Sequence, residues 1–324
     1  MTSNEHFLVT GAAGCIGIWV LRNLVQEGIP VTMLDLDMKR HRLPLLLNDE
    51  EIACIQFIHG DVSDYPSVEN AIKSSGANRI IHLAALQLPF CKADPVAGAR
   101  VNVVGTVNIF EAVKRLGIKN LVYASSIAVY GMSEEYPDEP LAHDAPLKPR
   151  SHYGVYKQAN EGTAKVYLRD DSISSIGLRP YVVYGAGRDQ GMTSTPTKAM
   201  LAAADGQPYH ISFGGRYCFQ YGNDTAKAFI QAARADFKGA EVFNIGGDSV
   251  STAEVITAIE QANPSSRSRI TFDDNPLPFP PDVDNRALVS AIGPMLFTPL
   301  SEGVAETLDI FRRALKEGNI TKEG

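Results

Sequence analysis

Short apolar runs alternate with longer amphipathic stretches along the first half of the chain. The runs with the length and composition of buried strands are residues 7–9, 31–34, 55–58, 79–83, 121–124 and 173–178. The stretches between them that favour helices are residues 15–27, 64–75, 95–116 and 151–169. Apolar strands that alternate with helices are typical of a parallel sheet covered on both faces. The pattern therefore predicts a doubly wound α/β fold.

The regular alternation weakens after Arg179-Pro180. Gly and polar residues gather at 185–195, and further helices are predicted at 224–235, 251–262 and 300–316. We expect residues 1–180 to form the sheet domain and residues 181–324 to form mainly a smaller α/β region, with the chain recrossing between the two.

A glycine-rich segment follows the first apolar run directly. Gly11, Gly14 and Gly17 would allow a tight turn, close backbone approach to a phosphate, and close packing of the next helix on the strand. The N-terminus of that helix would then face the bound anion. This context predicts a Rossmann site for a dinucleotide pyrophosphate, lined by Gly11, Ala13, Gly14, Cys15, Ile16 and Gly17.

Acidic residues follow the next two predicted strands. Asp35 ends the second strand, where a carboxylate can accept hydrogen bonds from ribose hydroxyls and would repel a 2′-phosphate. This position favours NAD over NADP as the cofactor. Asp61, with Val62 after it, is placed to meet the adenine edge, and a simple loop aspartate is the alternative.

A candidate acid/base pair lies in the predicted helix 151–169. Lys157 comes four residues after Tyr153, so both share one helix face. A nearby ammonium lowers the pKa of a phenol, so we expect Lys157 to make the Tyr153 tyrosinate accessible as a general base. A serine after the fifth strand can hold the substrate oxygen. Ser125 and Ser126 both qualify, and their local spacing favours Ser126.

Composition narrows the class of protein further. The chain has 324 residues and a formal net charge of −7, and it shows no Lys/Arg run long enough for a nucleic-acid face. The short run 39–42 is interpreted as a solvated helix face. Four scattered cysteines form no CxxC pair, which suits a reducing compartment. With no secretory leader and no membrane-length apolar run, we expect a cytoplasmic protein that binds no membrane, nucleic acid or metal.

Together these motifs resemble the extended short-chain dehydrogenase/reductases, specifically the NAD-dependent epimerase/dehydratase family and its UDP-glucose 4-epimerase-like members. The resemblance runs over residues 6–290. The segments that carry it are Thr10 to Gly17, Asp61-Val62, His82 to Ala85, Asn102 with Gly105-Thr106, Ser126 with Val129 to Gly131, Tyr153 with Lys157, and Arg179-Pro180 before Val183 to Gly185.

The resemblance implies NAD held across the carboxyl ends of the strands and a catalytic triad of Ser126, Tyr153 and Lys157. It implies an NAD-binding domain over 1–180 that carries the triad, and a substrate-binding region over 181–324. It also implies a homodimer formed through helices 95–116 and 151–169. The further cofactor contacts that it implies come from Leu83, Ala84, Ala85, Asn102, Tyr153 and Lys157.

Two departures from the family pattern bear on the reaction. Ile127 and Ala128 stand where family dehydratases carry an acidic pair, which argues against elimination of water. The segment 211–221 is shorter than in sugar-nucleotide enzymes, and Arg216 is slightly out of register with the arginine that grips a diphosphate.

We therefore expect NAD-dependent oxidation of a secondary hydroxyl of a sugar or sugar nucleotide, with Tyr153 as base and net epimerisation as the outcome. One alternative is a dehydrogenase that releases the oxidised product of a free sugar, sugar acid or polyol. Another is an NAD-binding protein without catalysis. The residues expected to face the substrate are Gln87, Ser125, Ser126, Tyr153, Tyr181, Arg188 and Arg216.

Overall fold

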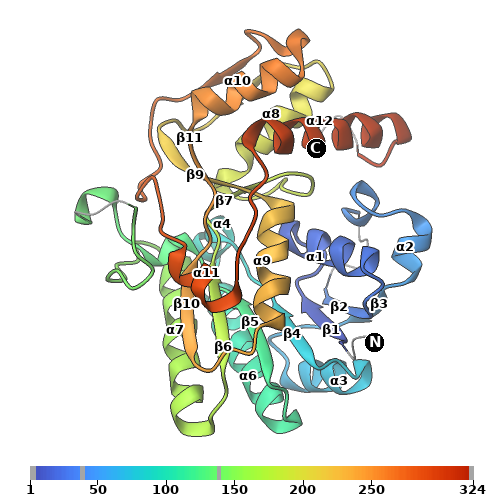
Figure 1. Cartoon of the computed structure of the whole chain (residues 1–324), viewed down its shortest axis with the longest axis vertical. Coiled ribbons are helices and arrows are strands. Elements are labelled where there is room, and N and C mark those ends of the chain that lie inside the picture. The colour runs from blue at the N-terminus through green and yellow to red at the C-terminus, as the bar shows by residue number, and fades with distance from the viewer. Residues whose placement is uncertain (1–4, 37–40, 137–139, 321–324) are drawn as a thin grey trace.

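A seven-stranded parallel sheet forms the lower half of the molecule in Figure 1. The computed structural model describes residues 5–36, 41–136 and 140–320. The strands of the sheet are β1 (Phe7–Thr10), β2 (Val31–Asp35), β3 (Gln56–His59), β4 (Arg79–His82), β5 (Asn120–Ala124), β6 (Ser175–Arg179) and β10 (Ala240–Asn244). Their order is β10-β6-β5-β4-β1-β2-β3, which reverses between β1 and β4 and so leaves a crevice at the carboxyl ends. The predicted doubly wound fold is confirmed.

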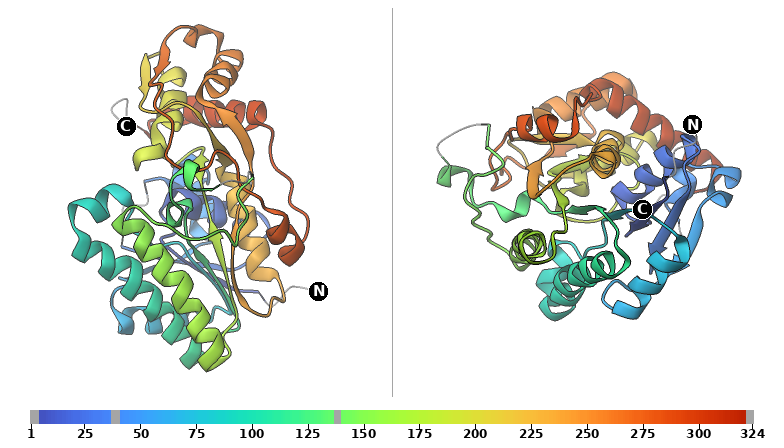
Figure 2. Two further views of the ribbon diagram at one scale, coloured as in Figure 1. Left: turned by 90° about the vertical axis from the view of Figure 1, so that its left-hand side faces the viewer. Right: turned by 60° about the horizontal axis from the view of Figure 1, so that its bottom comes forward.

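Helices cover both faces of this sheet (Figures 1 and 2). One face carries α3 (Tyr65–Ser75), α6 (Gly105–Leu116) and α7 (His152–Asp171), and the other carries α1 (Cys15–Gln26) and α9 (Gly222–Arg234). Leu8 of β1 belongs to the buried cluster of the first face, while Phe7 and Val9 belong to that of the second. Because successive side chains of a strand point to opposite faces, a strand buried on both sides has an uninterrupted apolar sequence.

A smaller region stands above the carboxyl ends of the sheet. It holds a three-stranded sheet of β7 (Val182–Tyr184), β9 (Arg216–Tyr221) and β11 (Asp248–Ser251), and a pair of β8 (Tyr209–Ile211) and β12 (Ile270–Phe272). Its helices are α8 (Thr195–Ala204), α10 (Thr252–Ala262) and α12 (Leu300–Glu317). Since α9 and β10 lie on the large sheet, the chain recrosses between the two regions. Among the shorter helices, α2 (Asp49–Ala53) contacts α1, α4 (Leu88–Ala93) contacts α7, and α11 (Arg286–Ile292) contacts β10.

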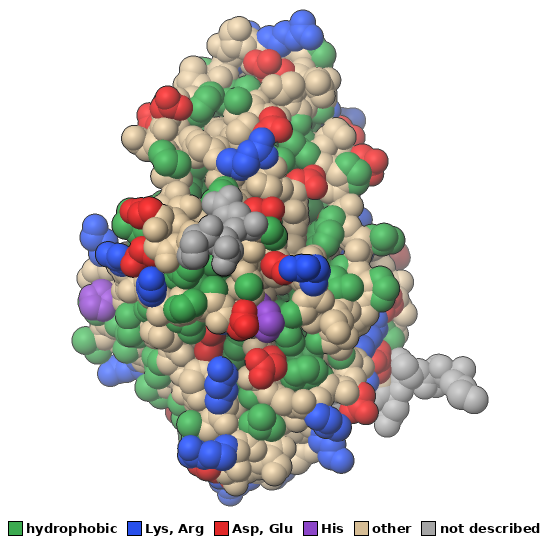
Figure 3. Space-filling model, turned by 60° about the vertical axis from the view of Figure 1, so that its left-hand side comes forward, with side chains coloured by type: hydrophobic (Ala, Val, Ile, Leu, Met, Phe, Trp, Pro, Cys, Tyr) green, Lys and Arg blue, Asp and Glu red, His purple; other side chains and the backbone are tan. Residues whose placement is uncertain are grey.

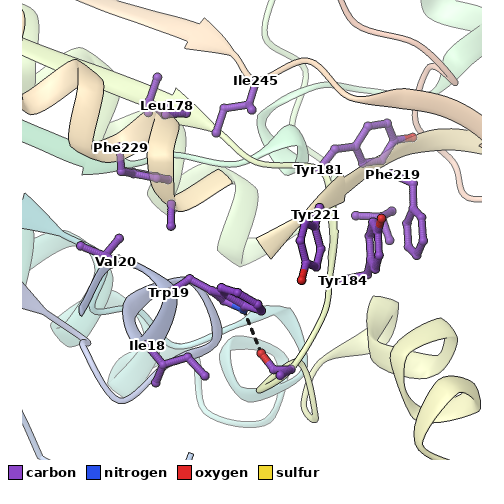
Figure 4. Close-up of a cluster of buried hydrophobic side chains, with 14 of the residues drawn as sticks. Ile18, Trp19, Val20, Leu178, Tyr181, Tyr184, Phe219, Tyr221, Phe229 and Ile245 are labelled. Atoms are coloured by element: carbon purple, nitrogen blue, oxygen red, sulfur yellow. Dashed lines mark hydrogen bonds between the residues drawn. The ribbon is translucent and has the colours of Figure 1, made fainter. Parts of the chain in front are cut away.

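Buried aromatic side chains join the two regions (Figure 4). Trp19 of α1 meets Tyr221 of β9 edge-on, with ring centroids 5.2 Å apart. Tyr184 stacks on Phe219 at a centroid distance of 4.0 Å. The Trp19 Nε1–H donates a hydrogen bond of 3.1 Å to the Ala186 carbonyl, drawn dashed in Figure 4. These contacts hold α1, which follows the glycine-rich loop, against the strands of the smaller region.

The surface carries mixed charge. On the face shown in Figure 3, Lys and Arg side chains are scattered among Asp and Glu. Within the described residues, no helix combines the length and apolar character needed to cross a membrane. The same residues contain no group of three or more His, Cys, Asp or Glu side chains arranged to hold a metal ion.

Candidate active site

One cleft at the carboxyl ends of the sheet strands brings together most of the residues predicted for cofactor and catalysis. The predicted residues that line it are Gly11, Ala13, Gly14, Cys15, Ile16, Gly17, Asp35, Asp61, Val62, Leu83, Ala84, Ala85, Gln87, Ser125, Ser126, Tyr153, Lys157, Tyr181 and Arg188. Asn102 and Arg216 are not among the lining residues. The nucleotide and catalytic motifs, far apart in the chain, therefore share one space.

The glycine-rich loop has the close packing that a dinucleotide cradle requires. Gly11 has φ +64°, and a Cβ there would lie 2.6 Å from the Cα of Ala84. A Cβ at Gly17 would lie 2.5 Å from the Ala12 carbonyl oxygen. Both distances are too short for any side chain, so these positions require glycine. Because Gly14 at the N-cap of α1 has no side chain to cap the helix, the first-turn N–H groups are available to an anion.

The polar groups around this cradle also fit NAD. The Ala13 N–H donates to Asp35 Oδ2 at 2.9 Å, which holds the carboxylate at the edge of the loop where a ribose would lie. Asp61 Oδ1 accepts from the Ser63 N–H at 2.8 Å. Burial raises the pKa of the Cys15 thiol to about 11, so this side chain stays neutral beside the pyrophosphate position.

A buried histidine supports the loop after β4. Burial lowers the pKa of His82 to about 3, so its ring is neutral. The Thr106 hydroxyl donates to the Asn102 carbonyl at 2.7 Å and therefore accepts from His82 Nε2 at 3.1 Å. His82 Nδ1 then accepts from the Thr10 hydroxyl at 2.7 Å, and the Thr10 oxygen receives the Ala84 N–H at 3.2 Å. This chain of hydrogen bonds sets the position of Ala84 at the cleft.

Asn102 lies behind this loop and outside the cleft. The stretch predicted as one helix is α5 (Pro95–Ala99), a π-helical turn over 100–104 and α6, and Asn102 lies in the π turn. Its Nδ2 donates to the carbonyls of Leu86 and Gly98, each at 3.0 Å. π turns often occur at functional sites. In this structure Asn102 supports the loop that ends at Gln87, and its contact with the cofactor stays a prediction.

The three candidate catalytic side chains meet where β5 ends against α7. The Ser126 hydroxyl lies near enough to Tyr153 to act on its pKa, and the Ser126 oxygen accepts a hydrogen bond of 3.2 Å from the Ala128 N–H. Lys157 Nζ donates to the Ala124 carbonyl at 2.7 Å and lies 5.7 Å from the centroid of the Tyr153 ring. Tyr156, the neighbouring tyrosine, donates to the Pro95 carbonyl at 2.9 Å and is not among the lining residues.

A buried ion pair separates the two candidate serines. The Ser125 hydroxyl donates to Glu161 Oε1 at 2.5 Å. Glu161 Oε2 accepts from Arg179 Nη2 at 2.7 Å, and the two side chains are 5% and 4% exposed. Arg179 also donates to the Tyr130 hydroxyl at 2.6 Å. The Ser125 hydroxyl is therefore directed at the ion pair, whereas Ser126 makes no contact with it and lies beside Tyr153 in the cleft.

The pKa of Tyr153 differs from the expectation. Burial raises it, while the Ser126 hydrogen bond and the charge of Arg188 act in the opposite direction. The pKa of Lys157 is itself lowered to about 8, mainly by burial. The expected lowering of the Tyr153 pKa by Lys157 is thus wrong for this structure, because the phenol is desolvated and the ammonium is directed at the Ala124 carbonyl.

We expect the rate of substrate oxidation to rise with pH on the alkaline side of neutrality. Tyr153 must be deprotonated to accept a proton. Because its pKa is raised, the tyrosinate becomes abundant only as the pH increases on the alkaline side. The measurement is a pH profile of kcat/KM for the wild type and Arg188→Met. Loss of the Arg188 charge should move the rising limb to higher pH, and a profile with no rising limb would contradict the assignment.

The structure adds lining residues that the sequence did not single out. They come from the loop after β7 and from a stretch with four prolines at 276–281: Gly187, Asp189, Gln190, Met192, Thr193 and Phe279. Arg42 also lines the cleft, and its side chain is 11% exposed. The interpretation of 39–42 as a solvated helix face is therefore wrong at Arg42, while Lys39 and Arg40 lie outside the described residues. The glycines at 185–191 were the available signal for this loop.

Arg216 lies away from the other candidate substrate residues. Its Nη2 pairs with Glu254 Oε2 at 2.9 Å on the surface, and its side chain is 48% exposed. The next residue of β9, Tyr217, points inward and accepts a hydrogen bond from the Thr252 hydroxyl at 3.3 Å. Strand alternation thus directs Arg216 outward. The predicted substrate contact of Arg216 is not supported by this placement.

Comparison with known proteins agrees with this geometry. The model of the NAD dependent epimerase/dehydratase family matches residues 7–246. A UDP-glucose 4-epimerase from Mycolicibacterium smegmatis is 30% identical over 321 residues, which cover 94% of this chain and 98% of that protein.

Solved structures extend the similarity to the whole fold. The UDP-glucose 4-epimerase of Thermus thermophilus, solved in complex with NAD, has a TM-score of 0.79 at 26% identity, over 96% of this chain and all of that one. An L-threonine dehydrogenase from Clostridium difficile has a TM-score of 0.82 at 23% identity, over 98% and 99% of the two chains. The latter similarity concerns the fold alone.

Proposed function

Because the chain belongs to the NAD-dependent epimerase/dehydratase family and is an NAD-dependent enzyme, we propose that it oxidises a secondary hydroxyl of a sugar or sugar nucleotide and that the net reaction is epimerisation. The observation that carries the proposal is that Ser126, Tyr153 and Lys157 line the same cleft as the glycine-rich loop, with Lys157 beside the Tyr153 ring. Similarity to UDP-glucose 4-epimerases supports the substrate class.

Each candidate side chain has a distinct task in this proposal. Bound NAD supplies the hydride acceptor and donor. Ser126 holds the substrate oxygen, and the Tyr153 oxygen takes the hydroxyl proton during oxidation and returns it during reduction. Lys157, oriented by the Ala124 carbonyl beside the Tyr153 ring, would hold the nicotinamide ribose. The apolar side chains of Leu86, Val183 and Phe279 line the cleft and exclude water from these groups.

A dehydrogenase acting on a small free substrate is the second candidate function. It is favoured by the charges of the cleft, because the cations among its described lining residues are Arg42, Lys157 and Arg188. Arg42 is paired with Asp189, and Lys157 is directed at Ala124. Among the described lining residues, Arg188 is then the single cation left to bind a substrate diphosphate. One cation is few for a group with two negative charges, so the cleft favours a free sugar, sugar acid or polyol.

The test is incubation of the purified enzyme and NAD with a panel of free sugars, sugar acids, polyols and nucleotide sugars. Absorbance of NADH and composition of the products are followed together. Product of inverted configuration without free NADH supports epimerisation. NADH that accumulates in proportion to oxidised product supports the dehydrogenase, and the responding substrate identifies its class. No turnover with any member of the panel contradicts both candidates.

We also propose that the enzyme is a homodimer formed through α5, the π turn and α7. Exposed apolar side chains gather on these elements: Val96, Val104, Val155 and Val166. A surface of this kind is typical of a contact between subunits.

Val155→Glu is expected to convert the dimer into a monomer, because a charge would be buried at the contact. Light scattering after size-exclusion chromatography measures the mass. The control is Leu296→Glu, since Leu296 is 90% exposed on a different segment and should leave the dimer intact. A wild-type protein that is monomeric at micromolar concentration would contradict the proposal.

A further inference from the structure

A glycine-rich strap, residues 185–191, borders the cleft beside the nucleotide cradle. Gly185, Gly187 and Gly191 have φ of +119°, +85° and +91°, a region that favours glycine. A Cβ on Gly187 would lie 2.5 Å from Ile18 Cδ1. The backbone at Gly187 therefore passes close to Ile18 of α1. This close approach and the hydrogen bond from Trp19 to Ala186 (Figure 4) hold the start of the strap against α1.

The far part of the strap is fastened through Asp189, which contacts Arg42 closely and His41 Nε2 more distantly, at 3.9 Å. Arg42 Nε and Nη2 each donate to a different oxygen of Asp189, both at 2.8 Å. Arg42 Nη1 also donates to the carbonyl of Ala13 in the glycine-rich loop at 2.9 Å. A single guanidinium thus joins the cradle to the strap, and all three residues line the cleft. A bidentate pair of this kind is directional, and its partial burial limits screening by salt.

The neighbouring Arg188 indicates what the strap encloses. Its Nη2 donates to Thr193 Oγ1 at 2.9 Å, while its buried Nε has no hydrogen-bond partner in the part of the chain that the structure describes. Its positive charge acts to lower the pKa of Cys15, in the cradle, and the pKa of Tyr153, against the larger effect of burial. Arg188, Cys15 and Tyr153 all line the cleft, so a dinucleotide bound there would bring its negative charge into the space that this guanidinium faces.

We propose that Arg42 and Asp189 form a clasp that closes the strap over the nucleotide cradle and retains NAD in the cleft from one catalytic cycle to the next. This rests on the proposed function and deepens it, because retention of the cofactor allows the oxidised substrate to be reduced again in place. The clasp then decides how often the enzyme epimerises and how often it releases NADH with an oxidised product.

The test measures dissociation of NAD in the absence of any sugar. Wild type and variants are loaded with NAD, desalted and mixed with an excess of a fluorescent NAD analogue, and the exchange rate is recorded. Asp189→Asn should exchange about ten times faster or more, since a charged, bidentate contact is replaced by a neutral one. Asp189→Glu, which keeps the charge, should remain closer to the wild type.

A matched control breaks an ion pair remote from the cleft. Asp309→Asn removes the exposed pair with Arg312 in α12 and should leave the exchange rate unchanged. Equal exchange rates for wild type and Asp189→Asn would overturn the proposal. So would a fall in the melting temperature of Asp189→Asn with no change in exchange, because the pair would then be only a structural link. Since no sugar is present, failure of the substrate panel does not affect this outcome.

Discussion

Tyr153→Phe is expected to lower kcat by about three orders of magnitude, because a positioned general base contributes about 10²–10⁴-fold to such a reaction. The substitution removes the phenol oxygen beside Ser126 and leaves the ring in place. Lys157 keeps its hydrogen bond to the Ala124 carbonyl, so the packing of α7 on β5 should persist. NAD binding is expected to change little. Steady-state kinetics and a titration of NAD binding check the two parts separately.

The same helix offers a matched control for this variant. Tyr156→Phe also removes one tyrosine hydroxyl, which donates to the Pro95 carbonyl outside the cleft. It should retain most of the activity. The proposed role of Tyr153 would be wrong if Tyr153→Phe and Tyr156→Phe had similar kcat values, or if the loss in Tyr153→Phe followed from loss of NAD.

Arg179→Met is expected to destabilise the folded protein by about 3–5 kcal/mol, the usual cost of leaving one partner of a buried ion pair without the other. Arg179 and Glu161 are both almost fully buried, and Arg179 also holds the Tyr130 hydroxyl and the His143 carbonyl. The free energy of unfolding, measured in urea, checks the prediction.

A double variant separates the ion pair from simple packing. Arg179→Met with Glu161→Gln removes both charges and should recover part of the stability lost in Arg179→Met. Asp309→Asn, which breaks an exposed pair, should change the unfolding free energy by less than about 1 kcal/mol. A double variant that is less stable than Arg179→Met would show that the loss does not come from an unpaired carboxylate.

The features that the sequence predicted correctly depend on local spacing. The glycine-rich loop at 11–17 and the shared face of Tyr153 and Lys157 follow from the periods of a turn and a helix, and the apolar runs show directly which strands are buried on both sides.

The features that the sequence did not predict depend on contacts between distant segments. Arg42 and Asp189 are 147 residues apart, so the sequence around Arg42 does not indicate that Asp189 is its partner. A shift of one residue in the register of β9 would turn Arg216 inward and Tyr217 outward, and the sequence alone does not fix that register. The pKa of Tyr153 is dominated by burial, which is a property of the completed fold.

The position of the lone tryptophan has a practical consequence for spectroscopy. Trp19 is the single tryptophan in the chain, and its indole N–H is bonded to the strap at Ala186. Its emission therefore arises from one site beside the nucleotide cradle. Reduced nicotinamide absorbs light where tryptophan emits, so energy transfer would quench this fluorescence when NADH occupies the cleft. The protein thus contains an intrinsic optical probe with which occupancy and redox state of the cofactor can be followed in real time, without a label.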